Sequence, residues 1–182
     1  MNLDKPNIRI LLSKCEKGDK TAQFAIYKLY YKAMYNCALR IVNDSFEAED
    51  IMQEAFLAAF TKLNSYSKKV TFGAWLKRIV INKSLSSLKK STIMETVDLE
   101  KVGINDMINE EIEVNNVNVN FILKQVNNLK TNYRIIINLN LIEGYDCEEI
   151  AQILNITYEN SRTTLSRAKN KLRQLLVPIY EG

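Results

Sequence analysis

The sequence predicts an all-α protein made of two small helical domains joined by a flexible linker, with a helix-turn-helix in the C-terminal domain. Only five glycines and two prolines occur in 182 residues, and apolar residues recur at helical spacing along most of the chain. The composition of one internal segment indicates where the two domains divide. Residues 91–118 are rich in Asn and acids and show no clean apolar period, which is typical of a connecting segment.

The N-terminal domain, residues 1–90, is expected to hold four helices. The first covers Ile8–Glu16, and Gly18-Asp19 ends it. Asn43-Asp44-Ser45 supplies turn and N-cap chemistry between the second and third helices. The three helices expected after the first are Thr21–Val42, Phe46–Asn64 and Val70–Lys90.

The C-terminal domain, residues 119–182, is expected to form a compact four-helix unit after the acidic, Asn-rich linker at 91–118. The linker carries scattered Val and Ile, so it could hold one short helix of its own. The four expected helices are Val119–Asn128, Asn132–Ile142, Cys147–Leu154 and Tyr158–Leu176.

The last two of these helices have the pattern of a helix-turn-helix. Ile150, Ala151, Ile153 and Leu154 provide one apolar face, and Asn155 suits the left-handed turn that follows. Thr157 is a good N-cap for the second helix. The core stripe of that helix is Ser161, Leu165, Ala168, Leu172 and Leu175, and a polar face turned away from it, suited to a DNA groove, consists of Asn160, Thr163, Thr164 and Arg167. The alternative interpretation is an ordinary helical hairpin with a solvated second helix.

Charge is distributed in blocks, although the net charge is only +4. Five acids and no base lie between Ile41 and Thr61, and seven bases and no acid lie between Tyr66 and Lys90. Basic surfaces suit phosphate and acidic surfaces suit other partners. Histidine is absent, and the cysteines Cys15, Cys37 and Cys147 show no metal-ligand spacing. With no catalytic motif either, the sequence predicts a cytoplasmic, non-enzymatic protein with no metal, no cofactor and no membrane insertion.

Two upstream segments carry the strongest further signals. Asp50, Gln53 and Glu54 share one helical face, which favours a basic partner but is also compatible with a solvated surface. The other segment joins aromatic and basic residues, as in surfaces that bind phosphates and stack on unpaired bases. For Phe72, Trp75 and Leu76, simple core packing is the alternative. The candidate DNA-binding residues of this segment are Phe72, Trp75, Lys77, Arg78, Asn82, Lys83, Lys89 and Lys90.

Taken together, these segments resemble the extracytoplasmic-function (ECF) sigma factors of bacterial RNA polymerase, from about Leu11 to Leu176. The string EAEDIMQEAFLAAF is similar to the family's core-binding segment, and FGAWLKRIVINKSLSSLKK to its melting and −10 helix. The region from LKTNYRIIINLN to NKLRQLL is similar to its −35-reading domain. The chain departs from the family at Ile81, Ser86 and Asn155, and at Asn160-Ser161, where the family often has Thr-Val.

The resemblance implies a function and its residues. It implies an initiation subunit that binds core RNA polymerase, recognises the −35 and −10 promoter elements and promotes DNA melting. The residues that would dock a coiled coil of the largest polymerase subunit are Asp50, Gln53, Glu54 and Phe56. Those that would read the −35 element are Tyr158, Glu159, Asn160, Arg162, Thr163, Thr164, Arg167 and Lys171.

The resemblance also implies an anti-sigma factor as a partner and a monomer when the protein is free. Two other classes of function remain open at the level of sequence. One is a helix-turn-helix regulator that binds palindromic duplex DNA as a homodimer, independent of polymerase. The other is an interaction module that mimics a sigma factor and titrates its regulator.

Overall fold

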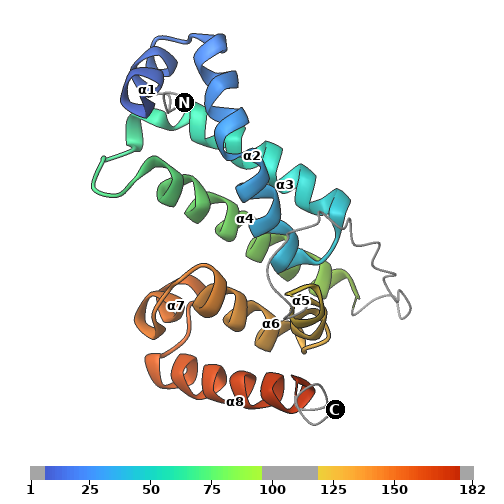
Figure 1. Ribbon diagram of the computed structural model, residues 1–182. Coiled ribbons are helices and arrows are strands. Elements are labelled where there is room, and N and C mark those ends of the chain that lie inside the picture. Colours follow the sequence, from blue (N-terminus) through green and yellow to red (C-terminus); the bar gives the residue numbers. More distant parts are fainter. Residues whose placement is uncertain (1–6, 96–118, 177–182) are drawn as a thin grey trace, which may run out of the picture. The chain divides into compact units, whose positions relative to one another are not determined.

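The computed structural model describes residues 7–95 and 119–176, and every regular element in these two ranges is helical (Figure 1). The chain divides into two compact units, residues 1–103 and 104–182. The predicted all-α class with two helical domains is therefore confirmed. The predicted linker at 91–118 lies outside the described residues from position 96 onward.

The first unit contains α1 (Ile8–Glu16), α2 (Lys20–Val42), α3 (Ser45–Thr61), the 3-10 turn η1 (Leu63–Ser65) and α4 (Phe72–Glu95). Helices α2, α3 and α4 pack against one another, and α1 packs on α2 (Figure 1). The core between them is made of fully buried apolar side chains from all three long helices. They include Ile26, Met34 and Ile41 of α2, Ala55 and Ala59 of α3, and Leu76 and Ile81 of α4.

Local side-chain chemistry begins and ends these helices at the predicted break, Gly18-Asp19, and at the predicted turn, Asn43-Asp44-Ser45. Gly18 has a φ of +81°, and the Asp19 carboxylate then accepts hydrogen bonds from the backbone N–H groups of Thr21 (2.8 Å) and Ala22 (3.1 Å). Asn43 ends α2 in the left-handed conformation, with a φ of 63°. Asp44 begins α3 by accepting a 2.8 Å hydrogen bond from the backbone N–H of Glu47. These bonds satisfy donors that a helix start leaves without intrahelical partners.

The second unit contains α5 (Val119–Asn127), α6 (Thr131–Ile137), the π-helical turn η2 (Asn138–Ile142), α7 (Cys147–Leu154) and α8 (Tyr158–Leu176). The η2 turn continues α6, so the two together match the single helix expected from Asn132 to Ile142. Helix α8 packs against α5, α6 and α7 (Figure 1). The largest side chains buried completely in this unit include Ile136, Ile137, Leu139 and Ile150.

Three boundaries differ from the prediction by two residues or more, and the other differences are of one residue. Helix α3 ends at Thr61 rather than Asn64, because the chain tightens into η1, where Ser65 N–H donates to the Lys62 carbonyl at 2.8 Å. Helix α4 begins at Phe72 rather than Val70. It also continues to Glu95 rather than ending at Lys90, so the first five residues assigned to the linker are helical. Residues 91–95 contain neither Gly nor Pro, so nothing in their chemistry stops the helix.

Candidate polymerase and promoter surfaces

The turn between α7 and α8 has the geometry of a helix-turn-helix. Asn155 ends α7 with φ 55° and ψ 53°, the left-handed conformation expected for it. Ile156 N–H donates to the Ala151 carbonyl at 3.0 Å, which closes the end of α7. Thr157 then caps α8, because its hydroxyl oxygen accepts a hydrogen bond from the backbone N–H of Asn160 at 3.2 Å. The two local predictions for this turn, at Asn155 and Thr157, are both confirmed.

Helix α8 separates a buried stripe from a polar face. Ser161, Leu165, Ala168 and Leu172 are each less than 10% exposed, whereas Leu175 at the end is half-buried. The stripe holds α8 on the rest of the unit and turns the other side outward. We call Asn160, Thr163, Thr164 and Arg167 the reading face; Thr164 is half-buried and the other three are exposed. The remaining residues predicted to contact the −35 element are also exposed: Tyr158, Glu159, Arg162 and Lys171.

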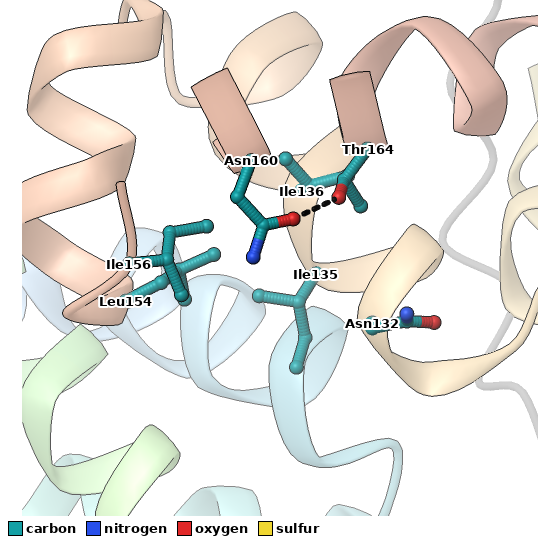
Figure 2. Close-up of a pocket in the computed structure, with 7 residues that line it drawn as sticks. All are labelled: Asn132, Ile135, Ile136, Leu154, Ile156, Asn160 and Thr164. Atoms are coloured by element: carbon teal, nitrogen blue, oxygen red, sulfur yellow. Dashed lines mark hydrogen bonds between the residues drawn. The ribbon is translucent and has the colours of Figure 1, made fainter. Parts of the chain in front are cut away.

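A shallow apolar pocket of about 210 Å³ adjoins the reading face, and the sequence pattern did not indicate it (Figure 2). Its lining comes from α6, from the end of α7 and the turn after it, and from the first turns of α8. Asn160 and Thr164 lie at its edge, where the Thr164 hydroxyl donates to the Asn160 side-chain oxygen at 3.1 Å (Figure 2). This bond leaves the Asn160 amide NH₂ available as a donor. The other lining residues are Asn132, Ile135, Ile136, Leu154 and Ile156.

The acidic face, defined as Asp50, Gln53 and Glu54, is exposed on α3. Gln53 donates to the Glu49 carboxylate at 3.2 Å, which orients the amide along the helix. Glu54 instead reaches across to α4, where its carboxylate accepts a 2.7 Å hydrogen bond from Lys83 Nζ. That hydrogen bond and the positive charge of Lys83 lower the pKa of Glu54. An ion pair so exposed stabilises the fold by less than about 1 kcal/mol.

Phe56, assigned above to the polymerase contact, lies instead in the core of the first unit. It is 3% exposed, and its ring centroid lies 4.9 Å from that of Tyr27 and 6.1 Å from that of Phe60. The reason is helical geometry: around the axis of α3, Phe56 lies about 120° from Asp50 but only about 40° from the buried Met52. We therefore correct this assignment and treat Phe56 as a packing residue.

Four aromatic side chains, which we call the aromatic cluster, meet at the start of α4. Phe72 is 2% exposed and makes edge-on contacts with Tyr30 (centroids 5.7 Å) and Tyr66 (5.8 Å). Phe72 is thus a core residue, which corrects its assignment as a DNA contact. Trp75 is half-buried, with its ring 5.2 Å from Tyr66 and 5.7 Å from Phe72. Tyr30 and Tyr66 were absent from the predicted site because they come from other segments.

The polar side chains along α4 differ in exposure. Asn82, Lys89 and Lys90 are exposed, whereas Lys77, Arg78 and Lys83 are half-buried. Lys83 is the residue that pairs with Glu54, so one predicted DNA contact is bonded to one predicted polymerase contact. The two surfaces therefore adjoin within the first unit, at an ion pair between α3 and α4.

Comparisons with known proteins identify the family. Residues 26–92 match the family model of sigma-70 region 2, and residues 122–172 match that of sigma-70 region 4, together more than half of the chain. The chain is 28% identical over 180 residues to the ECF RNA polymerase sigma factor SigW of Bacillus subtilis, covering 93% of this chain and 96% of that protein. It is 23% identical to the ECF RNA polymerase sigma-E factor of Haemophilus influenzae, covering 93% of this chain and 95% of that protein.

Solved structures agree with the sequence comparisons. The sigma factor RpoE of Bartonella quintana, solved with the anti-sigma factor NepR, superposes with a TM-score of 0.66 at 25% identity, covering 84% of this chain and 94% of that chain. Among the described residues, no helix combines the length and apolar character needed to cross a bilayer. The chain belongs to the sigma-70 family and, within it, to the extracytoplasmic-function class of bacterial sigma factors.

Proposed function

We propose that this sigma factor binds core RNA polymerase through the acidic face of α3, engages the −10 region through α4 and reads the −35 element through the reading face of α8. The observation that carries the proposal is the division of α8 into a buried stripe and an exposed polar face behind a helix-turn-helix turn. A helix held in this way can enter a major groove with its polar side toward the base edges.

Within α8, phosphate and base contacts have different consequences. The exposed bases Arg162 and Lys171, outside the reading face, suit phosphate oxygens, which position a helix in the groove without reading sequence. Amide, hydroxyl and guanidinium groups on the reading face can bond base edges, and Asn160 retains its amide NH₂ for this purpose. We propose that Asn160 and Arg167 contribute most to the choice of −35 sequence.

At α4, the half-buried Trp75 is the residue best suited to act during melting. Its ring packs on Tyr66 and Phe72 on one side and is open to solvent in part. A base released from the duplex could stack on the open part, with Asn82 and the lysines of α4 close to the backbone. Capture of such a base offsets an unstacking cost of a few kcal/mol, and strand opening by this route needs no covalent chemistry.

We propose that polymerase binding competes with the ion pair between Glu54 and Lys83. If a basic group of the polymerase pairs with the Glu54 carboxylate, the ion pair between Glu54 and Lys83 breaks. The Lys83 ammonium group can then bind a DNA phosphate. Since an exposed pair is worth less than about 1 kcal/mol, the exchange requires little free energy. Asp50 and Gln53 need no such exchange with α4, so they supply the first contacts with the polymerase.

The remaining assignments follow from the proposed role. The protein acts in the cytoplasm, where polymerase and promoters are found, as a monomer when it is free and as a subunit after it binds the polymerase. It has no catalytic step of its own. An anti-sigma factor is the proposed regulator, by analogy with the Bartonella protein solved with NepR.

Transcription with purified core polymerase tests the proposal, and the chain offers matched variants. Arg167→Ala should reduce formation of the closed promoter complex, with a loss of about 1–3 kcal/mol on the preferred −35 sequence if Arg167 reads a base. Arg173→Ala is the control on the same helix, since Arg173 lies outside the predicted contacts and bonds Asn170 at 2.8 Å. Gel shifts at several salt concentrations separate a base contact from a phosphate contact.

Trp75→Ala tests the melting role separately. We expect closed complexes to form nearly as for the unaltered protein and strand opening, followed by permanganate footprinting, to be impaired. Opening at the unaltered rate would show that Trp75 serves only to pack α4. Tight binding of a palindromic duplex by the isolated protein as a dimer would instead contradict the sigma-factor mechanism as a whole.

A further inference from the structure

The shallow pocket beside the reading face is almost entirely apolar. Ile135 and Ile136 line it from α6. Leu154 and Ile156 line it from the end of α7 and the turn that follows, and both are half-buried, so part of their apolar surface stays open. None of the lining residues carries a charge, so the pocket does not suit a phosphate. Its volume of about 210 Å³ is below the range of about 300–1,000 Å³ for small-molecule sites, so it suits a smaller apolar group.

Two polar side chains of the reading face stand at the edge of this pocket, one helical turn apart on α8. The Asn160 side-chain oxygen is directed at Thr164, because it accepts the 3.1 Å hydrogen bond from the Thr164 hydroxyl (Figure 2). The Asn160 amide nitrogen points the other way, toward the space between Ile156 and Ile135 (Figure 2). The mouth of the pocket therefore combines one hydrogen-bond donor with an apolar surface.

The four bases present different groups in the major groove. An Asn side chain that reads adenine uses its oxygen and its NH₂ group together, whereas the Asn160 oxygen is directed at Thr164. The NH₂ group alone matches an acceptor, which thymine supplies with O4 and guanine with O6 and N7. Of these two bases only thymine carries a methyl group, and an apolar surface gains from covering it. Cytosine suits the site least, because its N4 amino group is a donor and would face the donor of Asn160.

From this juxtaposition we infer that Asn160 and the apolar pocket together select thymine at one position of the −35 element. The Asn160 NH₂ group donates to thymine O4, and the 5-methyl group enters the pocket against Ile156 and Ile135. O4 and the methyl group are neighbours on the thymine ring, as the donor and the apolar surface are on the protein. The inference rests on the proposed −35 contact of α8 and deepens it, because it names a base and the groups that choose it.

The first test removes the methyl group from the DNA and leaves the protein unchanged. Holoenzyme made from the full chain and purified core polymerase binds its preferred promoter, and each thymine of the −35 element is replaced in turn by deoxyuridine. We expect one replacement to weaken closed-complex formation about fourfold, the effect of one buried methyl group. Replacing the same T·A pair by C·G should weaken it about tenfold or more. At that C·G pair, 5-methylcytosine should recover only the share due to the methyl group, about fourfold.

Protein variants then locate the effect in the pocket. With Ile156→Ala the penalty for deoxyuridine should fall below about twofold, because the methyl group has lost the surface that covers it. Ile142→Ala is the matched control: Ile142 is 40% exposed in the same unit, outside the pocket, and the penalty should persist. Asn160→Asp replaces the donor by an acceptor and should shift the preference from thymine toward cytosine. Each result is a ratio between two DNAs, so a variant that is less stable still gives a valid comparison.

The outcomes distinguish this inference from the proposed function. If Arg167→Ala weakens closed complexes whereas no deoxyuridine replacement does, α8 reads the −35 element and the selection of thymine is wrong. If neither change has an effect, the reading face itself is wrong. If the deoxyuridine penalty is the same with Ile156→Ala, the methyl group does not lie in this pocket. If Ile156→Ala weakens binding to core polymerase without DNA, the pocket takes an apolar side chain of the polymerase and the inference is overturned.

Discussion

Replacing Gly73 with alanine is expected to destabilise the first unit, although alanine is the better helix former by about 1 kcal/mol. Gly73 is the second residue of α4, next to Phe72. A Cβ atom at this position would lie 2.8 Å from Tyr30 Cε1 and 3.6 Å from Tyr30 Cδ1 and Cζ. Carbon atoms in favourable contact are about 3.5–4.0 Å apart, so the ring or the helix must move.

The size of the effect follows from two opposing contributions. Overpacking a well-filled site costs about 1–3 kcal/mol, and Tyr30 is held in place by its edge-on contact with Phe72 at 5.7 Å. The gain in helix propensity offsets at most about 1 kcal/mol of this. We therefore expect Gly73→Ala to lower the free energy of unfolding by up to about 2 kcal/mol. In a Tyr30→Ala background the clash is absent, so the same substitution should raise it by about 0.5–1 kcal/mol.

Urea unfolding followed by tryptophan fluorescence measures this quantity in the full chain. Trp75 is the single tryptophan, and it lies in α4 beside Tyr66, so its emission reports the unfolding of the first unit. Ala74→Gly, at the exposed next position, is the control for helix propensity and should cost about the same with or without Tyr30. If Gly73→Ala stabilises the unit equally in both backgrounds, contact with Tyr30 does not constrain position 73 and the reasoning fails.

Three further predictions concern single side chains. Ser161 is buried, and its hydroxyl has no hydrogen-bond partner among the described residues. Ser161→Ala should therefore raise the free energy of unfolding, measured by denaturant titration with circular dichroism, by about 1 kcal/mol. A decrease of that size in the free energy of unfolding would show that the hydroxyl is hydrogen-bonded. Lys83→Met should raise the pKa of Glu54 toward its ordinary value in NMR titrations, and an unchanged pKa would contradict the ion pair. Because the pKa of Glu54 is lowered by folding, the pair stabilises the fold above the ordinary carboxyl pKa, and this contribution is lost as pH falls through the lowered value. Cys147 is half-buried, whereas Cys15 is buried and its pKa is raised by burial. Cys147 should therefore react with a thiol reagent before Cys15. The reverse order would show that the start of α7 is less accessible than α1.

The parts of the fold that the sequence predicted well depend on residues close together in the chain. Gly18-Asp19 breaks the chain between two helices, Asp44 begins a helix, Asn155 ends one and Thr157 begins the next, because each bonds or bends the backbone within a few positions. The buried stripe of α8 is likewise a matter of period, and Leu165 lies on it as expected. Such features need only local geometry, so the fold class and the helix-turn-helix could be worked out from residues alone.

The sequence by itself determined which faces of the helices are acidic, basic or apolar, and only the tertiary structure decided what covers each face. Phe56 and Phe72 are both predicted as contact residues from the sequence, yet rings from α2 and from the segment before α4 bury them. The bond from Lys83 to Glu54 joins residues 29 positions apart, and Tyr30 closes on Gly73 from another helix. Helical periodicity defines directions around one axis, whereas burial and ion pairing depend on how several axes pack, which no single segment encodes.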